Sequence, residues 1–128
     1  MAQTESMEMY LETVYIIERD HGHAHVVDIA KKLDVSKPSV TKAMKLLKEK
    51  GLINKEAYGS ITLTDEGRTR SENIYKQHRI ITHYLEHSLG LSFEEAAQNA
   101  CRMEHVLSKT MVDAIEDYIQ KNEIKVTL

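Results

Sequence analysis

The feature that most constrains the fold is a pair of short helical segments joined by a three-residue turn. Apolar residues recur at helical spacing in residues 26–33, and a second helical segment runs from 37 to about 50. Ser36 is a suitable N-cap for the second segment, and Gly51 is a natural stop at its far end. This spacing predicts a helix-turn-helix.

Residues 52–55 and 60–63 alternate between apolar and polar side chains around the turn at 57–59, which predicts a short β-hairpin. A further helix is expected before the helix-turn-helix, over residues 6–20, because apolar side chains recur there at helical spacing. A helix-turn-helix followed by a hairpin is a winged helix. The N-terminal half, residues 1–63, is therefore expected to be a winged-helix DNA-binding domain.

The second half, residues 64–128, reads as helical throughout. Thr64 caps a long helix to about residue 89, with acidic residues in its first turn, where the helix dipole favours them. A further helical stretch covers 93–120, with a break near Ser108. The expected class is mainly α, a winged helix-turn-helix followed by a helical domain.

Positive charge is concentrated in the second helix of the helix-turn-helix, although the chain has a net charge of −3. A solvated lysine face would look the same on a lone helix, but the turn, cap and hairpin in register favour DNA binding. Residues near the helix start would reach base edges and later lysines would reach phosphates. The candidate DNA-binding residues are Ser36, Lys37, Pro38, Ser39, Thr41, Lys42, Lys45 and Lys50.

The one cysteine of the chain belongs to a compact cluster of metal-binding residue types. Cys101, Glu104 and His105 have the spacing i, i+3 and i+4, which places three side chains on one face of a helix. Taken singly, each fits a structural role: a buried cysteine, a surface glutamate, a satisfied histidine. Together, a thiolate, a carboxylate and an imidazole favour a site for a divalent transition metal. Neither a signal peptide nor a membrane span is recognisable, so a cytoplasmic location is expected.

Four segments together resemble the diphtheria toxin repressor family, the metal-activated bacterial regulators of iron or manganese uptake. These segments are residues 6–11, 35–42, 63–67 and 100–108. The resemblance covers nearly the whole chain, and the last segment is its most specific part. It implies a short form that ends before the SH3-like domain of larger members.

The resemblance also implies a ligand set. Met9, Cys101, Glu104 and His105 match the primary metal site of the iron-responsive members, and His78 matches a histidine of their ancillary site. Thr82 and Ala97 stand where that branch has a glutamate and a histidine. Glu12 matches a ligand of the manganese-responsive branch, so a second metal held by Glu12, His78 and a shared Glu104 or His105 is possible.

The implied function is a metal-activated DNA-binding repressor of iron or manganese homeostasis genes. Met9 and Cys101 are soft ligands that favour Fe²⁺, with Mn²⁺ as the alternative and Co²⁺, Ni²⁺ or Zn²⁺ as surrogates. A homodimer would read a palindromic operator in double-stranded DNA. An apolar stripe beyond the winged helix is expected to form the dimer: Ile74, Ile81, Leu85 and Leu89.

Two alternatives remain open at this point. The first is a winged-helix regulator that does not need metal. The second is a small zinc hydrolase, because Cys-x-x-Glu-His faintly resembles the inverted zinc-peptidase pattern His-x-x-Glu-His. DNA binding that ignores a chelator would indicate the first, and turnover would indicate the second.

Overall fold

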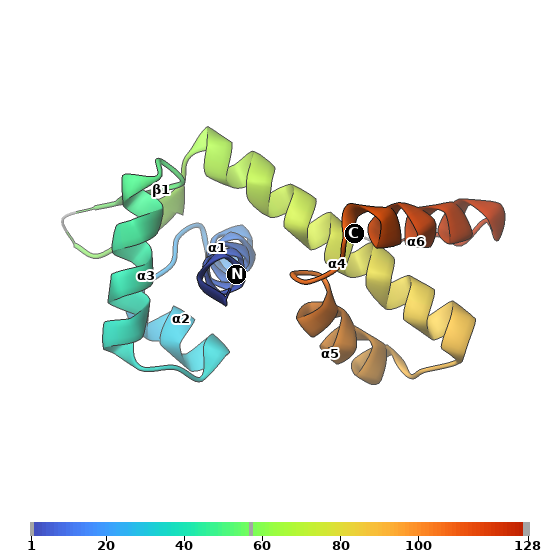
Figure 1. The fold of residues 1–128 in the computed structure, drawn as a ribbon. Helices are drawn as coiled ribbons and strands as arrows, with labels where there is room; N and C mark the ends of the chain where they lie inside the picture. Colours follow the sequence, from blue (N-terminus) through green and yellow to red (C-terminus); the bar gives the residue numbers. More distant parts are fainter. Residues whose placement is uncertain (1, 57, 127–128) are drawn as a thin grey trace. The chain divides into compact units, whose positions relative to one another are not determined.

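The computed structural model describes residues 2–56 and 58–126, and within them the chain is mainly helical (Figure 1). The expected fold class is confirmed, with a small two-stranded wing between the third and fourth helices. The first helix begins earlier than predicted, and the break near Ser108 is present. In order the elements are α1 (Ala2–His21), α2 (Val26–Leu33), α3 (Lys37–Glu49), β1 (Ile53–Lys55), β2 (Ile61–Leu63), α4 (Asp65–Leu89), α5 (Phe93–Met103) and α6 (Lys109–Lys121).

The chain divides into two compact units, Met1–Glu72 and Asn73–Leu128, and the division falls within α4. None of the helices in the described part of the chain is both long and apolar enough to cross a membrane.

In the first unit, α1, α2 and α3 pack together with the β-hairpin. The two strands are antiparallel, and Ile53 pairs with Leu63 and Lys55 with Ile61. Ala24, in the loop after α1, forms a further antiparallel bridge to Ile61, so this loop adds one hydrogen-bonded residue pair to the sheet. Ala57, at the predicted hairpin turn, lies outside the described residues.

The helix-turn-helix forms as the sequence predicts. The Ser36 side chain accepts a hydrogen bond of 3.3 Å from the Ser39 amide, which caps α3. Gly51 follows the helix with φ of +74°, the left-handed conformation that favours glycine. One face of α3 is buried in the core of this unit, through Val40, Ala43, Met44 and Leu47.

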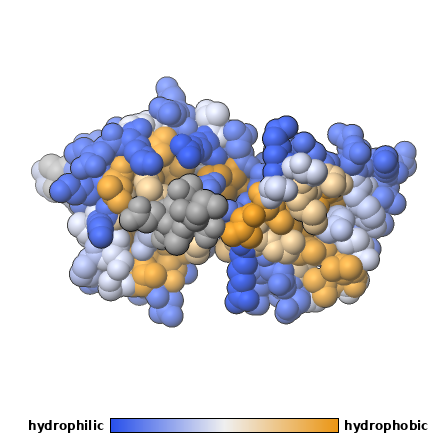
Figure 2. Space-filling view, in the orientation of Figure 1, coloured by the Kyte–Doolittle hydropathy of each residue, from blue (hydrophilic) through white to orange (hydrophobic). Residues whose placement is uncertain are grey.

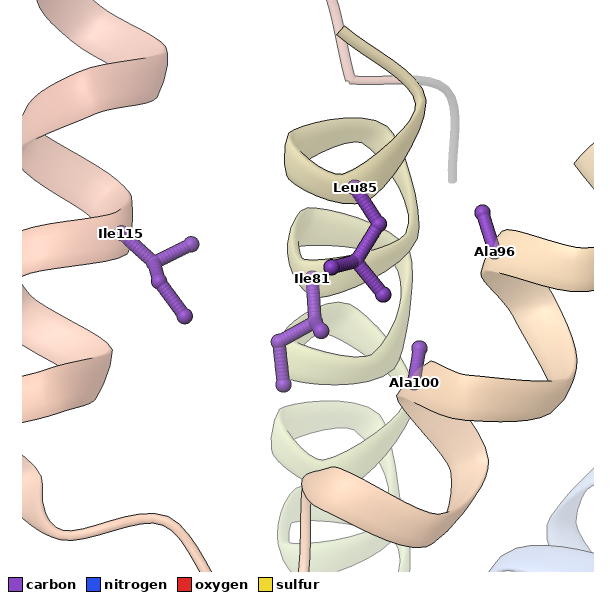
Figure 3. Packing of buried hydrophobic residues seen from close by; sticks show 5 residues of the cluster. All are labelled: Ile81, Leu85, Ala96, Ala100 and Ile115. Atoms are coloured by element: carbon purple, nitrogen blue, oxygen red, sulfur yellow. The ribbon is translucent and has the colours of Figure 1, made fainter. Parts of the chain in front are cut away.

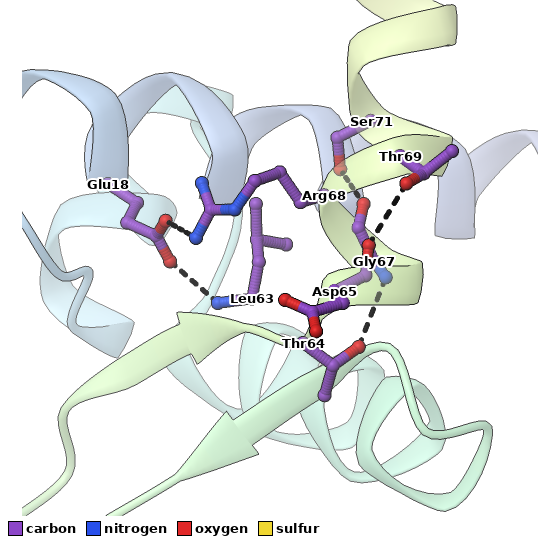
Figure 4. A network of polar contacts seen from close by, with 8 residues as sticks. All are labelled: Glu18, Leu63, Thr64, Asp65, Gly67, Arg68, Thr69 and Ser71. Carbon is purple, nitrogen blue, oxygen red and sulfur yellow. Dashed lines mark hydrogen bonds and ion pairs between the residues drawn. The ribbon is translucent and has the colours of Figure 1, made fainter.

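A polar network fastens the start of α4 to α1 and β2 (Figure 4). The buried carboxylate of Glu18 accepts a hydrogen bond of 2.6 Å from the Leu63 amide and forms an ion pair of 2.5 Å with Arg68. Thr64 caps α4 as predicted, because its hydroxyl accepts a 3.0 Å hydrogen bond from the Gly67 amide. The winged-helix unit thus holds the first turn of α4 at two points.

Gly67 is required by a close backbone approach. A Cβ atom at this position would lie 1.9 Å from the carbonyl oxygen of Leu52. That oxygen already accepts a hydrogen bond of 3.1 Å from the Thr64 amide. Because the obstructing atoms belong to the backbone, no side-chain rotation relieves the contact.

The second unit has its own hydrophobic core between α4, α5 and α6 (Figure 3). Two of its members, Ile81 and Leu85, are 0% and 5% exposed. The prediction that these two residues form the dimer surface is therefore wrong: the helical stripe is real, but α5 and α6 of the same chain cover it. The core cluster is Ile81, Leu85, Ala96, Ala100 and Ile115.

Hydrophilic residues dominate the face shown in Figure 2, and hydrophobic residues reach the surface in several places. Among the described residues of the second unit, the large hydrophobic side chains that stay exposed are those of Leu89, Phe93, Val106 and Met111.

Candidate metal centre and DNA-reading surface

Glu104 is held in place through its backbone. It forms the C-cap of α5, and its amide donates a 2.9 Å hydrogen bond to the carbonyl of Ala100. Its own carbonyl accepts a 2.9 Å hydrogen bond from the side-chain amide of Gln77 on α4. These two contacts fix the backbone of Glu104 against α5 and α4.

The Glu104 carboxylate lies beside two imidazoles. Its Oε1 atom is 3.3 Å from Nε2 of His105 and 3.7 Å from Nδ1 of His78. The side chain is 1% exposed. Within the described residues, neither carboxylate oxygen takes part in a hydrogen bond. A buried carboxylate needs a compensating charge, and a divalent cation supplies one. These residues therefore fit a metal ion.

The surroundings of His78 lower its pKa, which suits a metal ligand. Burial lowers its pKa, and this effect outweighs the nearby Glu104 carboxylate, which raises the pKa. The charges of Arg79 and His105 lower the pKa of His78 further. A lowered pKa keeps the imidazole neutral, and a metal binds the neutral imidazole.

The cysteine–glutamate–histidine cluster does not lie on a single helix, contrary to the sequence prediction. Helix α5 ends at Met103, so Cys101 is in its last turn and His105 is in the turn that follows. The reason is local: the amides of Val106 and Leu107 both bond to the Met103 carbonyl, at 3.0 and 3.2 Å, and this tightens the chain into a turn. Cys101 is partly buried.

Thr82, at a position where the resemblance places a ligand of the iron-responsive branch, is fully buried and makes a local contact. Its hydroxyl donates a hydrogen bond of 2.8 Å to the carbonyl of His78, one helical turn earlier. Ala97, the second replaced position, is partly buried in α5 and has no ligand atom in its side chain.

Met9 and Glu12, the other two candidate ligands, lie three residues apart on α1, in the first unit. Glu12 is 8% exposed and Met9 is 37% exposed. The Met9 carbonyl accepts a 2.8 Å hydrogen bond from the Thr13 hydroxyl. Within the second unit, by contrast, the structure brings together His78, Glu104 and His105.

The candidate DNA-binding residues share one surface. All eight are exposed, on or beside the face of α3 that is turned away from the core. Two of them are engaged with each other: the hydroxyls of Ser36 and Ser39 are 2.8 Å apart at the helix start. Because these hydroxyls serve the cap, the lysines of this surface are better candidates for contacts with DNA.

Comparison with known protein families gives two adjoining matches. Residues 3–61 match the family described as "Iron dependent repressor, N-terminal DNA binding domain". Residues 64–125 match the family described as "Iron dependent repressor, metal binding and dimerisation domain". The two matches together account for nearly all of the chain.

Individual relatives agree with these matches. The HTH-type transcriptional regulator MntR of Geobacillus kaustophilus is 34% identical over 117 residues, which cover 91% of this chain and 82% of the relative. An uncharacterized HTH-type transcriptional regulator of Methanocaldococcus jannaschii is 32% identical over 124 residues, or 96% of this chain and 99% of the relative.

Among solved structures, that of the manganese regulator SloR matches with a TM-score of 0.76 at 29% sequence identity. The match covers 89% of this chain and 53% of the SloR chain. The chain therefore spans about half the length of that solved protein.

Proposed function

The chain belongs to the family of iron-dependent repressors, and we propose that Fe²⁺ is the ion that activates its binding to DNA. The resemblance indicated by the sequence motifs is thus confirmed. The family consists of metal-dependent transcriptional regulators of iron or manganese homeostasis, not of enzymes, so the hydrolase and the metal-independent regulator are both set aside. Divalent-metal binding, DNA binding and dimerisation follow from the two matched domains.

The observation that supports a divalent metal ion at this site is the buried Glu104 carboxylate, with an imidazole nitrogen of His105 at 3.3 Å and one of His78 at 3.7 Å. Carboxylate and imidazole are donors that Fe²⁺, Mn²⁺ and Zn²⁺ all accept. We therefore propose Glu104 and His105 as ligands of the primary ion, with His78 as a ligand of a second ion.

Met9 and Cys101 complete the proposed primary set, and their sequence match to the iron-responsive branch supports this. A thioether and a thiolate are softer than the oxygen and nitrogen donors that suit Mn²⁺, which favours Fe²⁺. We assign Glu12, together with His78, to the second ion. Mn²⁺ stays the alternative, because Glu12 matches the manganese branch and SloR is described as a manganese regulator.

The metal preference is tested by exchanging the two soft ligands for carboxylates. We expect the double variant Met9→Asp with Cys101→Glu to respond to Mn²⁺ at lower concentration and to lose its preference for Fe²⁺ in anaerobic DNA-binding titrations. Met111→Asp, an exposed methionine on α6, is the matched control and should keep the wild-type order. Equal responses of the wild type to both ions, or an unchanged order in the double variant, would show that these residues do not set selectivity.

The proposed mechanism is a shift between conformations. Met9 and Glu12 belong to the DNA-reading unit, whereas Cys101, Glu104 and His105 belong to the helical unit. A bound metal would supply positive charge to ligands that belong to both units. Its binding would therefore favour the conformation in which all of these ligands reach it. At a metal concentration one hundred times the dissociation constant, binding stabilises that conformation by about 2.7 kcal/mol.

Because the protein acts on DNA, we infer a cytoplasmic location.

We propose that a homodimer reads a palindromic operator, with one α3 helix in each half-site. Since Ile81 and Leu85 are interior, the dimer must use other hydrophobic side chains of the second unit. The exposed Leu89 and Phe93 are suitable. Sedimentation of the wild type should show a dimer at micromolar concentration, and Leu89→Lys with Phe93→Lys should shift it towards the monomer. A wild-type monomer, or an unaffected dimer, would refute this assignment.

A further inference from the structure

A second cluster of metal-binding residue types lies on α4, away from the centre around Glu104. His83, Glu86 and His87 have the spacing i, i+3 and i+4, the same as the spacing of positions 101, 104 and 105. In a helix, this spacing places three side chains on one face. We propose that these three residues form an additional site for a divalent transition metal, independent of the site that activates DNA binding.

The contact between His83 and Glu86 already has the arrangement of a ligand pair. Nδ1 of His83 lies 3.1 Å from Oε1 of Glu86. Oε1 is shielded from solvent and accepts no hydrogen bond within the described residues. The same combination occurs at Glu104, where Oε1 is buried, makes no hydrogen bond to the described part of the chain and faces an imidazole nitrogen at 3.3 Å. An imidazole and a carboxylate that converge in this way can share a cation.

His87 supplies the third donor after a change of side-chain conformation. Its Nδ1 atom is 3.0 Å from the hydroxyl of Tyr118 on α6, and the two rings meet edge to face with centroids 5.7 Å apart. His87 is exposed, so its ring can turn towards His83 once the contact with Tyr118 is given up. Residues four apart on a helix have Cβ atoms only about 5–6 Å apart, a separation that two imidazoles bridge around one ion. Tyr118 therefore competes with the metal for His87.

The donor set indicates the class of ion. Two imidazoles and one carboxylate suit Zn²⁺, Ni²⁺ and Cu²⁺ and lack the soft thiolate proposed for the primary centre. The cluster is more exposed than Glu104, with side-chain exposures of 16% for His83 and 30% for Glu86. Solvent competes for the ion at such a site, so we expect weaker binding than at the primary centre.

The test is a Zn²⁺ titration of the full chain, followed by NMR of its seven histidine imidazoles and by equilibrium dialysis. We expect the His83 and His87 resonances to shift together in a later phase than those of the Glu104 centre. His83→Gln with His87→Gln should lose one bound equivalent, while the primary phase stays unchanged. His21→Gln, an exposed histidine at the end of α1, is the control and should keep the full stoichiometry.

Tyr118→Phe gives an independent readout, because it removes the competitor of His87 without touching a ligand. We expect the later phase to shift to a Zn²⁺ concentration about two- to tenfold lower, the effect of freeing one hydrogen bond. The proposal is overturned if the double glutamine variant keeps its stoichiometry, or if His83 and His87 do not shift together in the wild type. Loss of the primary phase alone would count against the proposed function and leave this site standing.

Discussion

Replacing Glu104 by glutamine should stabilise the metal-free protein while abolishing most of the metal response. In the absence of metal, the 1% exposed carboxylate makes no hydrogen bond in the described chain, although two imidazoles lie beside it. An unsatisfied buried polar group costs about 1–3 kcal/mol, and more when it is charged. Glutamine keeps the size and removes the charge, so we expect Glu104→Gln to gain about 1 kcal/mol, or roughly 3–6 °C in Tm for a chain of this length.

With metal, the order of stability should reverse. At one hundred times its dissociation constant, the ion stabilises the wild type by about 2.7 kcal/mol. If the loss of the charged ligand weakens binding a hundredfold, the same concentration stabilises the variant by only about 0.4 kcal/mol. The metal response thus falls by about 2.3 kcal/mol, more than the gain expected in the metal-free state.

The assay is thermal unfolding of both proteins with chelator and with saturating Mn²⁺ or anaerobic Fe²⁺. Glu116→Gln, the same change at an exposed position on α6, is the control and should behave like the wild type in both conditions. A variant that melts below the wild type with chelator, or that keeps the full metal shift, would refute the interpretation of Glu104 as a ligand whose burial costs stability.

Three further predictions concern the first unit. Gly67→Ala should destabilise the protein by about 2–3 kcal/mol in urea unfolding, because the added Cβ meets the Leu52 carbonyl oxygen at 1.9 Å; unchanged stability would contradict that geometry. Glu18→Gln should cost about 1–3 kcal/mol by removing the charge that pairs with Arg68. A destabilisation that disappears at high salt would argue against a buried interaction. Lys42→Ala should alter sequence preference, whereas Lys50→Ala should weaken all sequences alike and reduce the salt slope by about one; a uniform loss in both would remove Lys42 from base readout.

Most of the secondary structure could be predicted, because its signals are local. Ser36 and Gly51 mark the ends of α3, and Ser108 marks the start of α6 through its bond from the Met111 amide. The sequence predicts the break near Ser108 but not that α5 already ends at Met103, because the turn at residues 104–107 depends on the Met103 carbonyl, which two amides share, and no glycine or proline marks it.

The periodicity of apolar residues does not predict which elements pack against each other. The pattern of Ile81 and Leu85 identifies a buried face, but whether another chain or α5 and α6 cover it depends on how the helices cross. The pairing of Glu18 with Arg68 joins residues far apart in sequence, and each alone reads as an ordinary surface charge.

The candidate site was predictable to a similar extent. The spacing of Glu104 and His105, and the three ligand types in one short segment, identify these two residues. Only the family resemblance identifies His78, because it lies 26 positions before Glu104 and no local pattern links the two residues. The bond from Gln77 to the Glu104 carbonyl had no sequence signal at all, since a glutamine on a long polar helix is unremarkable.

The most direct test of the central claim is the affinity of the protein for its own operator with and without metal. The operator is first selected from random DNA by binding in the presence of Fe²⁺. Anaerobic titrations with Fe²⁺ and with chelator then give two dissociation constants, and an unrelated duplex gives the reference. We predict that Fe²⁺ tightens operator binding about a hundredfold, which corresponds to about 2.7 kcal/mol, and leaves the unrelated duplex almost unchanged. Equal operator affinities with Fe²⁺ and with chelator would contradict metal activation.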